Sequence, residues 1–504
     1  MNSESSRTSN SVKNVISNFS YQILLIILGF VSRTIFLRVL SIEYLGIQGL
    51  FSDILSLLSM ADLGFNTAMT FSLYKPLAEK DTNTISGLIN FYKKVYRIIA
   101  ITIFLIGVLL IPFLKFIVNL ENTLPHISLY YFLYLLNTVA SYLVVYKTII
   151  LQADQKAHIV TKYSSIFSTL QTICMLVFLI ITHNFLIYLS VQVIFTYFSN
   201  FYISSVASRL YPYINDEVSL PKDKTKGIFD NIKSVFIYKV SSVLINATDN
   251  TLISIIIGTV ATGLYSNYTM IILKLTSLIN TVFYSLTSSL GNLIITEGKE
   301  KRFQIFQVLQ TVSNIFCIVC VTIVLFLVQD FIKIWLGNEY LLDNMVVYAI
   351  VLNFYFSISL LPIWVFREAT GLYNQIKYVM LITAILNLII SIALGNLIGL
   401  SGILLGTSIS RILTYFWYEP ILLFNKYFGH SSKVYFGALL KSLFLLVVIV
   451  MISLGISRFV VVNNITSLML KGIILFLVSS TCAVFSYRNS EGYRFLKKKI
   501  SERF

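Results

Sequence analysis

Charged residues are scarce in this chain. Asp, Glu, Lys and Arg make up only 12% of its 504 residues, whereas 57% are hydrophobic, and apolar runs of about 20 residues follow one another along the sequence. This composition excludes a soluble domain with one large core, because ordinary domains carry about twice this share of charge. The chain is therefore predicted to be an integral membrane protein.

Cysteine and histidine are also scarce, at four residues each. All four cysteines lie in apolar runs, and the Cys317–Cys320 spacing has no second pair and no neighbouring histidine. Cys174, Cys317, Cys320 and Cys482 are therefore predicted to pack in the interior, and no metal site is expected.

Enzyme motifs are absent from the sequence. The chain has no Walker A loop, no G-x-S-x-G motif and no soluble stretch that could hold a nucleotide. We expect no catalytic residues, no cofactor and no ATP-driven pumping by this chain alone. The net charge of +16 has no soluble face on which nucleic acid could bind, so the expected partners of the basic residues are anionic membrane lipids.

The hydropathy pattern predicts about fourteen membrane-spanning helices, and hence an all-α polytopic membrane protein. The predicted spans are 15–38, 44–72, 95–118, 127–149, 163–182, 185–206, 233–257, 262–295, 304–328, 342–366, 377–396, 399–424, 435–457 and 466–487. Very short connections, such as His183-Asn184, force neighbouring spans to run antiparallel.

Basic residues set the predicted orientation. With the N-terminus inside, the cytoplasmic tails and loops hold 28 of the 38 Lys and Arg residues, and the outer side holds five. Because Lys and Arg concentrate in cytoplasmic loops, both termini are predicted to be cytoplasmic. The outer loops are short, which leaves no external domain to receive a substrate.

A weak internal repeat relates the two halves of the chain. At a shift of 217 residues, Leu45-Gly46 falls on Thr262-Gly263, and at a shift of 220 Lys147 falls on Arg367. Six spans per copy give both copies one orientation, so they are related by an axis along the membrane normal. The predicted parts are a cytoplasmic tail (1–14), a six-helix N-lobe (15–206), a cytoplasmic linker (207–232), a six-helix C-lobe (233–424), two C-terminal helices (435–487) and a basic cytoplasmic tail (488–504).

One face of span 2 is polar. Seven polar residues recur there at every third or fourth position, which places them on one face of a single α-helix: Gln48, Ser52, Ser56, Ser59, Asp62, Asn66 and Thr70. Spans 1, 7 and 8 carry similar faces, with Asn267 and Lys274 on span 8. Because these four helices are the leading pairs of the two repeats, we expect them to line a polar cleft.

Charged residues inside the spans are the candidate functional groups. A charge near the bilayer centre costs at least about 2.5–3.5 kcal/mol, so it needs a partner or a role. The candidates for substrate binding are Arg33, Lys239, Lys274, Arg411 and Asn250, and the carboxylates of the same region are Asp53, Asp62 and Asp249. The basic excess suits an anionic substrate with a phosphate or pyrophosphate group.

Alternatives stay open for these residues. An ion pair such as Arg33–Asp53 could serve only to hold helices together, and Lys239 is close enough to a span end to reach the interface. The three carboxylates are either counter-ions of the basic residues or sites that bind H⁺ or Na⁺ and couple transport to an ion gradient. Glu43 and Glu419 are expected at span ends, in water.

The chain resembles the multidrug/oligosaccharidyl-lipid/polysaccharide exporter superfamily over essentially its whole length. The resemblance rests on fourteen spans, on two six-span lobes and on the spacing of residues in span 1, namely Asn14, Ser17, Asn18, Tyr21, Gly29, Phe30 and Arg33. The runs Leu45–Gly49 and Ala61–Phe65 are similar to those of the Wzx-type oligosaccharide flippases.

This resemblance implies two helical bundles that open alternately to the two sides of a bacterial cytoplasmic membrane. It also implies a substrate made of an oligosaccharide on undecaprenyl pyrophosphate, held by basic residues that include Arg33, and it suggests a polysaccharide polymerase and glycosyltransferases as partners. The sequence has Arg33-Thr34 where lipid II flippases have an Arg-Asp pair, which argues against the lipid II branch. Drug exporters usually stop at twelve spans, which argues against the drug-exporting branch.

The expected function is therefore a flippase for a lipid-linked oligosaccharide repeat unit, in the synthesis of capsule or another surface polysaccharide. A lipid II flippase and a cation-coupled multidrug exporter are the alternatives within the superfamily. A non-transporting membrane scaffold is the alternative from another class.

Overall fold

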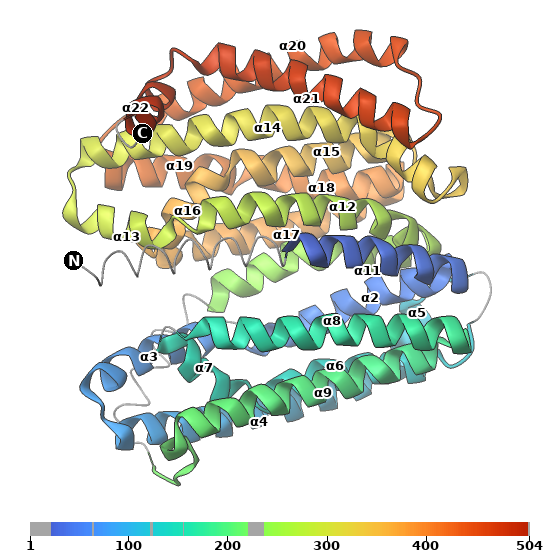
Figure 1. Cartoon of the computed structure of the whole chain (residues 1–504), viewed down its shortest axis with the longest axis vertical. Coiled ribbons are helices and arrows are strands. Elements are labelled where there is room, and N and C mark those ends of the chain that lie inside the picture. The colour runs from blue at the N-terminus through green and yellow to red at the C-terminus, as the bar shows by residue number, and fades with distance from the viewer. Residues whose placement is uncertain (1–21, 63–64, 121–123, 155, 220–235, 502–504) are drawn as a thin grey trace. The chain divides into compact units, whose positions relative to one another are not determined.

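The computed structural model of the protein describes residues 22–62, 65–120, 124–154, 156–219 and 236–501 (Figure 1). Throughout this part of the chain the secondary structure is helical, without a strand, as predicted. The predicted tail 1–14 and residues 220–232 of the predicted linker lie outside the described residues.

The chain divides into two compact units, residues 1–263 and 264–504, with the boundary inside α12. The predicted lobe boundaries stay a prediction. The first unit contains a helix over 22–39, α2 (Ile42–Leu58), η1 (Ser59–Asp62), α3 (Phe65–Glu79), α4 (Thr82–Leu110), η2 (Ile111–Phe113), α5 (Leu114–Ile117), α6 (Ile127–Tyr142), α7 (Val145–Ala153), α8 (Ala157–Thr182), α9 (Phe185–Leu210), η3 (Pro212–Asn215), a helix over 236–246, α11 (Asp249–Ile256) and the start of α12 (Thr259–Tyr284).

The second unit continues from α12 to the basic C-terminal helix. It contains α13 (Thr287–Thr296), α14 (Lys299–Trp335), η4 (Asn338–Tyr340), α15 (Asn344–Ser359), α16 (Leu361–Thr370), α17 (Tyr373–Ile398), α18 (Leu400–Leu413), α19 (Tyr415–Leu423), the π-helical turn η5 (Phe424–Phe428), α20 (Lys433–Phe459), α21 (Ile465–Tyr487) and α22 (Glu491–Ser501).

The helices match the predicted membrane spans. Eight described helices are long and apolar enough to cross a membrane, and two bent helix pairs bring the number to ten. The four other predicted spans coincide with helices that are interrupted or less apolar: α2 with α3, residues 236–246 with α11, α12 with α13, and α18 with α19. The chain is therefore a multi-pass, all-helical membrane protein with about fourteen spans.

The internal repeat is visible where the helices break. The pair α6–α7 bends by 46°, and its counterpart α15–α16 bends by 44°. The next helices, α8 and α17, have 26 residues each. After the bend, Lys147 on α7 donates a hydrogen bond to Ser208 on α9, and its counterpart Arg367 on α16 donates to Glu419 on α19. In both copies a basic residue therefore ties the fourth span to the sixth.

Aromatic side chains fill the interior of each unit. In the first unit, the ring of Phe36 packs edge to face on Phe185 and Tyr188, with centroids 5.9 and 5.5 Å apart. In the second unit, Phe306 contacts Phe366 and Phe428 at 5.6 and 5.0 Å. Edge-to-face pairs add about 0.5–1.5 kcal/mol to the burial of their large apolar area. These clusters fix the positions of helices that carry the polar residues discussed below.

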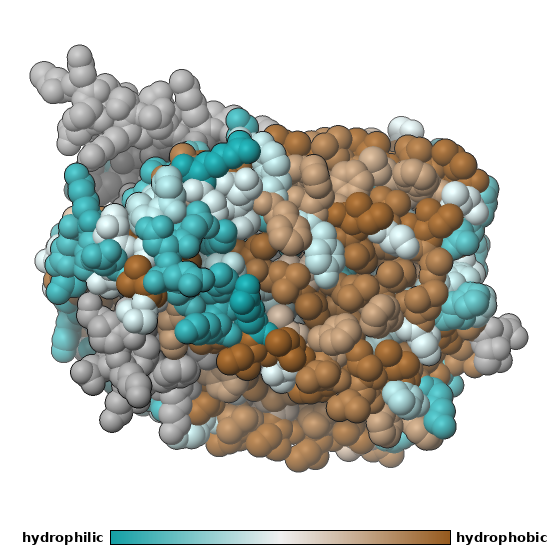
Figure 2. All heavy atoms as spheres, turned by 90° about the horizontal axis from the view of Figure 1, so that it is seen from below, coloured by the Kyte–Doolittle hydropathy of each residue, from teal (hydrophilic) through white to brown (hydrophobic). Residues whose placement is uncertain are grey.

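The outer surface of the helices is apolar, as contact with lipid requires. Ile98, Ile101, Leu105 and Leu109 expose more than half of their area along one side of α4. Figure 2 shows a face of the molecule on which hydrophobic residues cover a broad area and hydrophilic residues gather mainly at one end. This distribution is typical of helices that span a bilayer.

A small polar cluster stabilises the connection between α7 and α8. Lys156 Nζ lies 2.8 Å from Asp154 Oδ2, and the hydroxyl of Tyr211, just after α9, donates to the same carboxylate. Burial alone would raise the pKa of Asp154, but the hydrogen bonds from Lys156 and Tyr211 outweigh it and hold this pKa below its ordinary value. The charged form of Asp154 is therefore the one that stabilises the turn.

The last two spans lie along the long helix α14, as Figure 1 shows for α20 and α21. An ion pair of 2.7 Å between Lys471, near the start of α21, and Asp330, near the end of α14, joins two of these helices. Both side chains are largely buried, so removing either one would leave an uncompensated charge.

Candidate functional site

Three of the predicted site residues come together at the contact between α2 and α11. The backbone N–H of Asn250 donates a hydrogen bond of 3.1 Å to the carboxylate of Asp53, and the side-chain amide of Asn250 also binds this carboxylate. Asp249 is close enough to repel the charge of Asp53. The structure thus places two carboxylates and one amide, from the second and seventh spans, in one polar cluster.

The predicted outer end of this contact is closed by hydrogen bonds. Thr259 at the start of α12 donates from its N–H to the carbonyl of Asn119 (2.8 Å), and its hydroxyl accepts from the N–H of Asn119 (3.0 Å). Ser254 on α11 donates to the carbonyl of Ile117 at the end of α5 (2.9 Å). The seventh and eighth spans are therefore fastened to the third at the end where all three leave the membrane.

Two glycines make the same closure tight. An added Cβ on Gly46 would lie 2.0 Å from the carbonyl oxygen of Thr259, and one on Gly263 would lie 2.6 Å from the carbonyl oxygen of Ile42 and 3.1 Å from the nitrogen of Gly46. Gly46 and Gly263 are equivalent positions of the predicted repeat. The helices α2 and α12 can approach this closely only because neither position has a side chain.

The polar face of span 2 is interrupted, which corrects the prediction of one continuous helix. The helix α2 ends at Leu58 and continues as the 3₁₀ turn η1 before α3 begins. Ser56 and Ser59 each return a hydrogen bond of 2.7 Å to the carbonyl four residues earlier, a pattern that often bends helices. Before the break, Ser52 and Ser56 are exposed while Phe51 on the opposite side is buried, so the face itself is polar and open as expected.

The basic candidates of the first unit lie on separate helices. Arg33, on the helix over 22–39, is partly buried, and its charge interacts with the side chains of Tyr134 on α6 and Tyr188 on α9. Lys239, on the helix over 236–246, is also partly buried. Asp62 ends η1, and its side chain lies outside what the structure describes.

The basic candidates of the second unit differ in burial. Lys274, midway along α12, is half-buried, whereas Asn267 on the predicted polar face of this helix is fully buried. Arg411, in the last turn of α18, is only 7% exposed. It hydrogen-bonds to Tyr415, yet its Nε and Nη1 atoms have no hydrogen-bond partner within the described part of the chain.

One buried ion pair corrects a prediction. Glu419 was expected in water at a span end, but it is 4% exposed, and both of its carboxylate oxygens accept from Arg367 Nη1, at 3.1 and 3.2 Å. Glu368 adds a second carboxylate 3.6 Å from Arg367, and Tyr373 donates a short hydrogen bond to Glu368. Span 12 breaks at Thr414, where α18 ends, and Glu419 lies on the buried side of the helix α19 that follows.

The sequence contained a signal for this pair that hydropathy alone does not reveal. Glu419 is the single acidic residue of span 12. Arg367 is the basic residue that the repeat makes equivalent to Lys147. A carboxylate in an apolar run predicts a buried basic partner as readily as a water-exposed end. The closure by Thr259 and Asn119 had no such signal, because hydroxyl and backbone groups are too common to single out.

Three comparisons with known proteins bear on the identity of the chain. Residues 11–287 match a family model described as polysaccharide biosynthesis protein. A comparison with curated protein sequences found no match. The family match covers more than half of the chain, including the Asp53–Asn250 cluster and the closure between Thr259 and Asn119.

Solved structures with the same fold are membrane transporters. The lipid II flippase MurJ in an inward closed conformation is 16% identical, with a TM-score of 0.66, and the match covers 95% of this chain and 99% of that one. An inward-facing multidrug resistance MATE family transporter of the MOP superfamily is 14% identical (TM-score 0.57; 80% of this chain, 96% of that one). A Vibrio cholerae MATE transporter, VcmN, is 12% identical (TM-score 0.53; 78% and 91%). At these identities the likeness shows the fold, and together with the family match it confirms the predicted superfamily.

Proposed function

Because the chain belongs to the family of polysaccharide biosynthesis proteins, we propose that it is a flippase for an undecaprenyl-pyrophosphate-linked oligosaccharide repeat unit. It carries this unit from the inner to the outer leaflet of a bacterial cytoplasmic membrane, for capsule or another surface polysaccharide. Both termini lie in the cytoplasm, and the chain itself catalyses no reaction. The glycosyltransferases that build the unit and the polymerase that consumes it are its partners in the pathway.

The buried guanidinium of Arg411 is the observation that carries the proposal. It sits in an apolar span, and two of its nitrogen atoms have no acceptor among the described residues. A buried charge whose hydrogen bonds are incomplete is costly, so such a group is retained where a ligand supplies the missing acceptors. Phosphate and pyrophosphate match the donor fork of arginine, and a lipid-linked sugar brings that group to the depth of a membrane span.

Transport proceeds by alternating access. The hydrogen bonds of Thr259 and Asn119 and the contact of Gly46 with Gly263 close the outer ends of α2, α11 and α12. Release of the substrate to the outer leaflet requires these contacts to separate. Each basic candidate of the spans (Arg33 and Lys239 in the first unit, Lys274 and Arg411 in the second) is proposed to bind the headgroup as it enters from the cytoplasmic leaflet, while the lipid tail stays in the bilayer.

The carboxylate cluster supplies the coupling to an ion gradient. Asp53 and Asp249 repel each other across the α2–α11 contact, and a proton or a sodium ion bound there would relieve this repulsion. Asn250 belongs to the same cluster, and its carbonyl accepts a hydrogen bond from Thr262 on α12 (3.4 Å), so ion binding at the cluster acts on the helix that begins at the closure. The rival role, counter-ions for the basic residues, predicts transport that does not depend on a gradient.

Complementation of a strain that lacks the protein tests the proposal. Arg411→Gln removes the guanidinium donors to a phosphate, and loss of charge-assisted hydrogen bonds worth about 1.5–3 kcal/mol reduces surface polysaccharide about tenfold or more. Arg33→Ala and Lys274→Ala reduce it as well. Lys441→Ala is the matched control, because Lys441 on α20 is exposed and lies over the ring of Tyr487. Full export by all three variants at wild-type protein level would rule out the site.

The alternatives make distinct predictions. A lipid II flippase would rescue a strain defective in flipping the peptidoglycan precursor, and a multidrug exporter would drive gradient-dependent drug efflux from vesicles. The MATE transporter match covers 96% of that chain but only 80% of this one, so this chain is longer than those exporters. A scaffold without transport activity would protect the polar faces of spans 1, 2, 7 and 8 from aqueous thiol reagents.

A further inference from the structure

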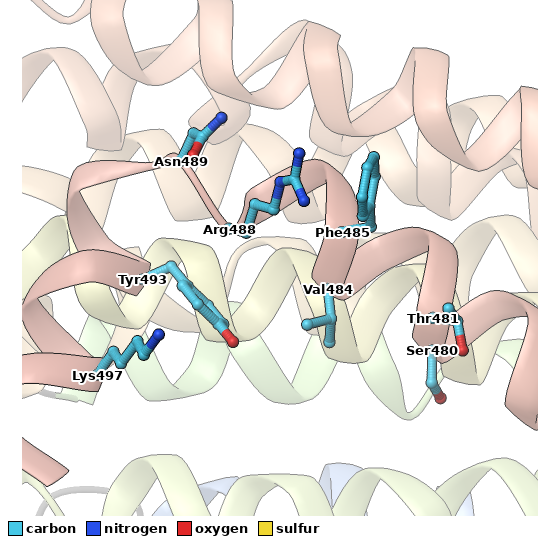
Figure 3. A pocket seen from close by; sticks show the side chains of 8 residues that line it. All are labelled: Ser480, Thr481, Val484, Phe485, Arg488, Asn489, Tyr493 and Lys497. Carbon is cyan, nitrogen blue, oxygen red and sulfur yellow. The ribbon is translucent and has the colours of Figure 1, made fainter. Parts of the chain in front are cut away.

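A groove of about 810 Å³ lies where α21 ends and α22 begins, far along the chain from every residue of the proposed substrate site. Figure 3 shows its lining, which comes from the last turns of α21, the turn that follows, and α22. The lining residues are Ser480, Thr481, Val484, Phe485, Arg488, Asn489, Tyr493 and Lys497. None of these residues is used by the proposed transport cycle.

The polar part of the lining fits a phosphate group. Arg488 and Lys497 provide two positive charges, and Tyr493 lies between them in the view of Figure 3. Hydroxyl groups of Ser480 and Thr481 add donors from α21. A guanidinium, an ammonium and hydroxyl donors line this one open groove, and these are the groups that bind phosphate diesters.

The apolar part of the lining fits an acyl chain. Val484 and Phe485 are exposed, and Leu477 and Phe476, one to two turns earlier on α21, expose more than half of their area. The guanidinium of Arg488 lies 3.8 Å from the centroid of the Phe485 ring, so the charge sits directly above the apolar surface. A membrane span with a cation at its end and an open apolar face below it presents both halves of a phospholipid site.

The wall formed by α22 is held in place by the rest of the second unit. Gly492 packs so closely on α14 that an added Cβ would lie 2.4 Å from the carbonyl oxygen of Gln307. Gln307 donates a hydrogen bond of 2.8 Å to Glu491, and the ammonium of Lys301 lies over the ring of Phe495. Because α22 is seated by these contacts, Tyr493 and Lys497 are positioned before any ligand arrives.

We infer that this groove is a binding site for the phosphate headgroup of one anionic glycerophospholipid, such as phosphatidylglycerol, with an acyl chain along α21. Charge favours this occupant, since the turn and α22 carry Arg488, Arg494, Lys497, Lys498 and Lys499 against Glu491. A zwitterionic headgroup would fit less well, because its own positive group would be repelled by the basic residues of the groove. Free phosphate would leave the apolar face of α21 uncovered.

Lipid binding to the full-length protein tests the inference. The protein is purified in detergent, phosphatidylglycerol or phosphatidylcholine is added, and retained lipids are counted by native mass spectrometry. The test variant is Arg488→Gln with Lys497→Gln. The matched control is Lys162→Gln with Lys433→Gln, which removes two exposed basic residues at the start of α8 and α20 and so changes the net charge equally.

The wild-type protein and the control variant should each retain one tightly held phosphatidylglycerol. The test variant should bind it about thirtyfold more weakly, because each basic residue near a membrane surface contributes about a fivefold gain in affinity for anionic lipid. Equal retention by the test variant, equal retention of phosphatidylcholine, or displacement of the lipid by millimolar inorganic phosphate would each overturn the inference. A monodisperse elution profile for both variants establishes that the fold is intact.

Discussion

The contact between Gly46 and Thr259 allows a sharp test of the closure at the predicted outer side. In Gly46→Ala the new methyl group would lie 2.0 Å from the Thr259 carbonyl oxygen, where ordinary contacts begin near 3.4 Å. The start of α12 must therefore move away from α2 by about 1.4 Å or more. Overpacking of this kind costs about 1–3 kcal/mol in the closed form and nothing in the open form. The ratio of open to closed protein should rise about 5- to 150-fold.

The opening is measured with a cysteine reporter. Cys174, Cys317, Cys320 and Cys482 are first replaced by alanine, and Thr262, which is fully buried beside the closure, becomes Thr262→Cys. A membrane-impermeant thiol reagent applied from outside should label this cysteine at least about fivefold faster with Gly46→Ala. Gly437→Ala is the control, because an added Cβ at Gly437 meets nothing within 4 Å. Unchanged labelling in Gly46→Ala, with normal protein level, would refute the closure.

Three further predictions concern single carboxylates. Asp53→Asn keeps an acceptor for Asn250 but removes the charge, so export should continue while losing its dependence on an ion gradient in vesicles; unchanged dependence would assign Asp53 a counter-ion role. Glu419→Gln should lower the free energy of unfolding by about 3–5 kcal/mol, because it removes the buried negative charge that Arg367 faces; thermal unfolding measures this, and Arg367→Met in the same chain should restore part of it. Asp154→Asn should reduce thermal stability at pH 7 by no more than the about 0.2–1 kcal/mol of an exposed pair. The lowered pKa of Asp154 means that its contribution is complete above the ordinary carboxyl pKa and is lost as the pH falls through the lower value, so the difference from wild type should vanish in strong acid.

Much of the fold could be predicted from the sequence, because the bilayer imposes a length and an apolar composition on each span. The repeat was also readable, and its equivalence of Lys147 with Arg367 agrees with the role that both residues play after a helix bend. Periodicity could not predict the break after Leu58. A helix face is defined by spacing alone, whereas the break depends on hydroxyl groups that compete for backbone carbonyls.

The candidate site was predictable in part, because polar residues stand out in apolar spans but their contacts do not. Asp53, Asp249 and Asn250 stood out as polar residues in apolar spans, and the structure brings them together. Whether Glu419 would meet water or Arg367 depended on a helix break at Thr414 that no local pattern encodes. Shared position in a repeat, as for Gly46 and Gly263, indicated equivalence but not that the two residues pack against each other.

The most direct test of the proposed function is translocation by the purified protein in liposomes. A fluorescent oligosaccharide on undecaprenyl pyrophosphate is placed in the membrane, and a membrane-impermeant quencher reports how much of it reaches the opposite leaflet. The account predicts rapid, complete quenching with the wild-type protein and quenching at least about tenfold slower with Arg411→Gln. Quenching no faster than in protein-free liposomes, by folded wild-type protein under an imposed proton or sodium gradient, would contradict it.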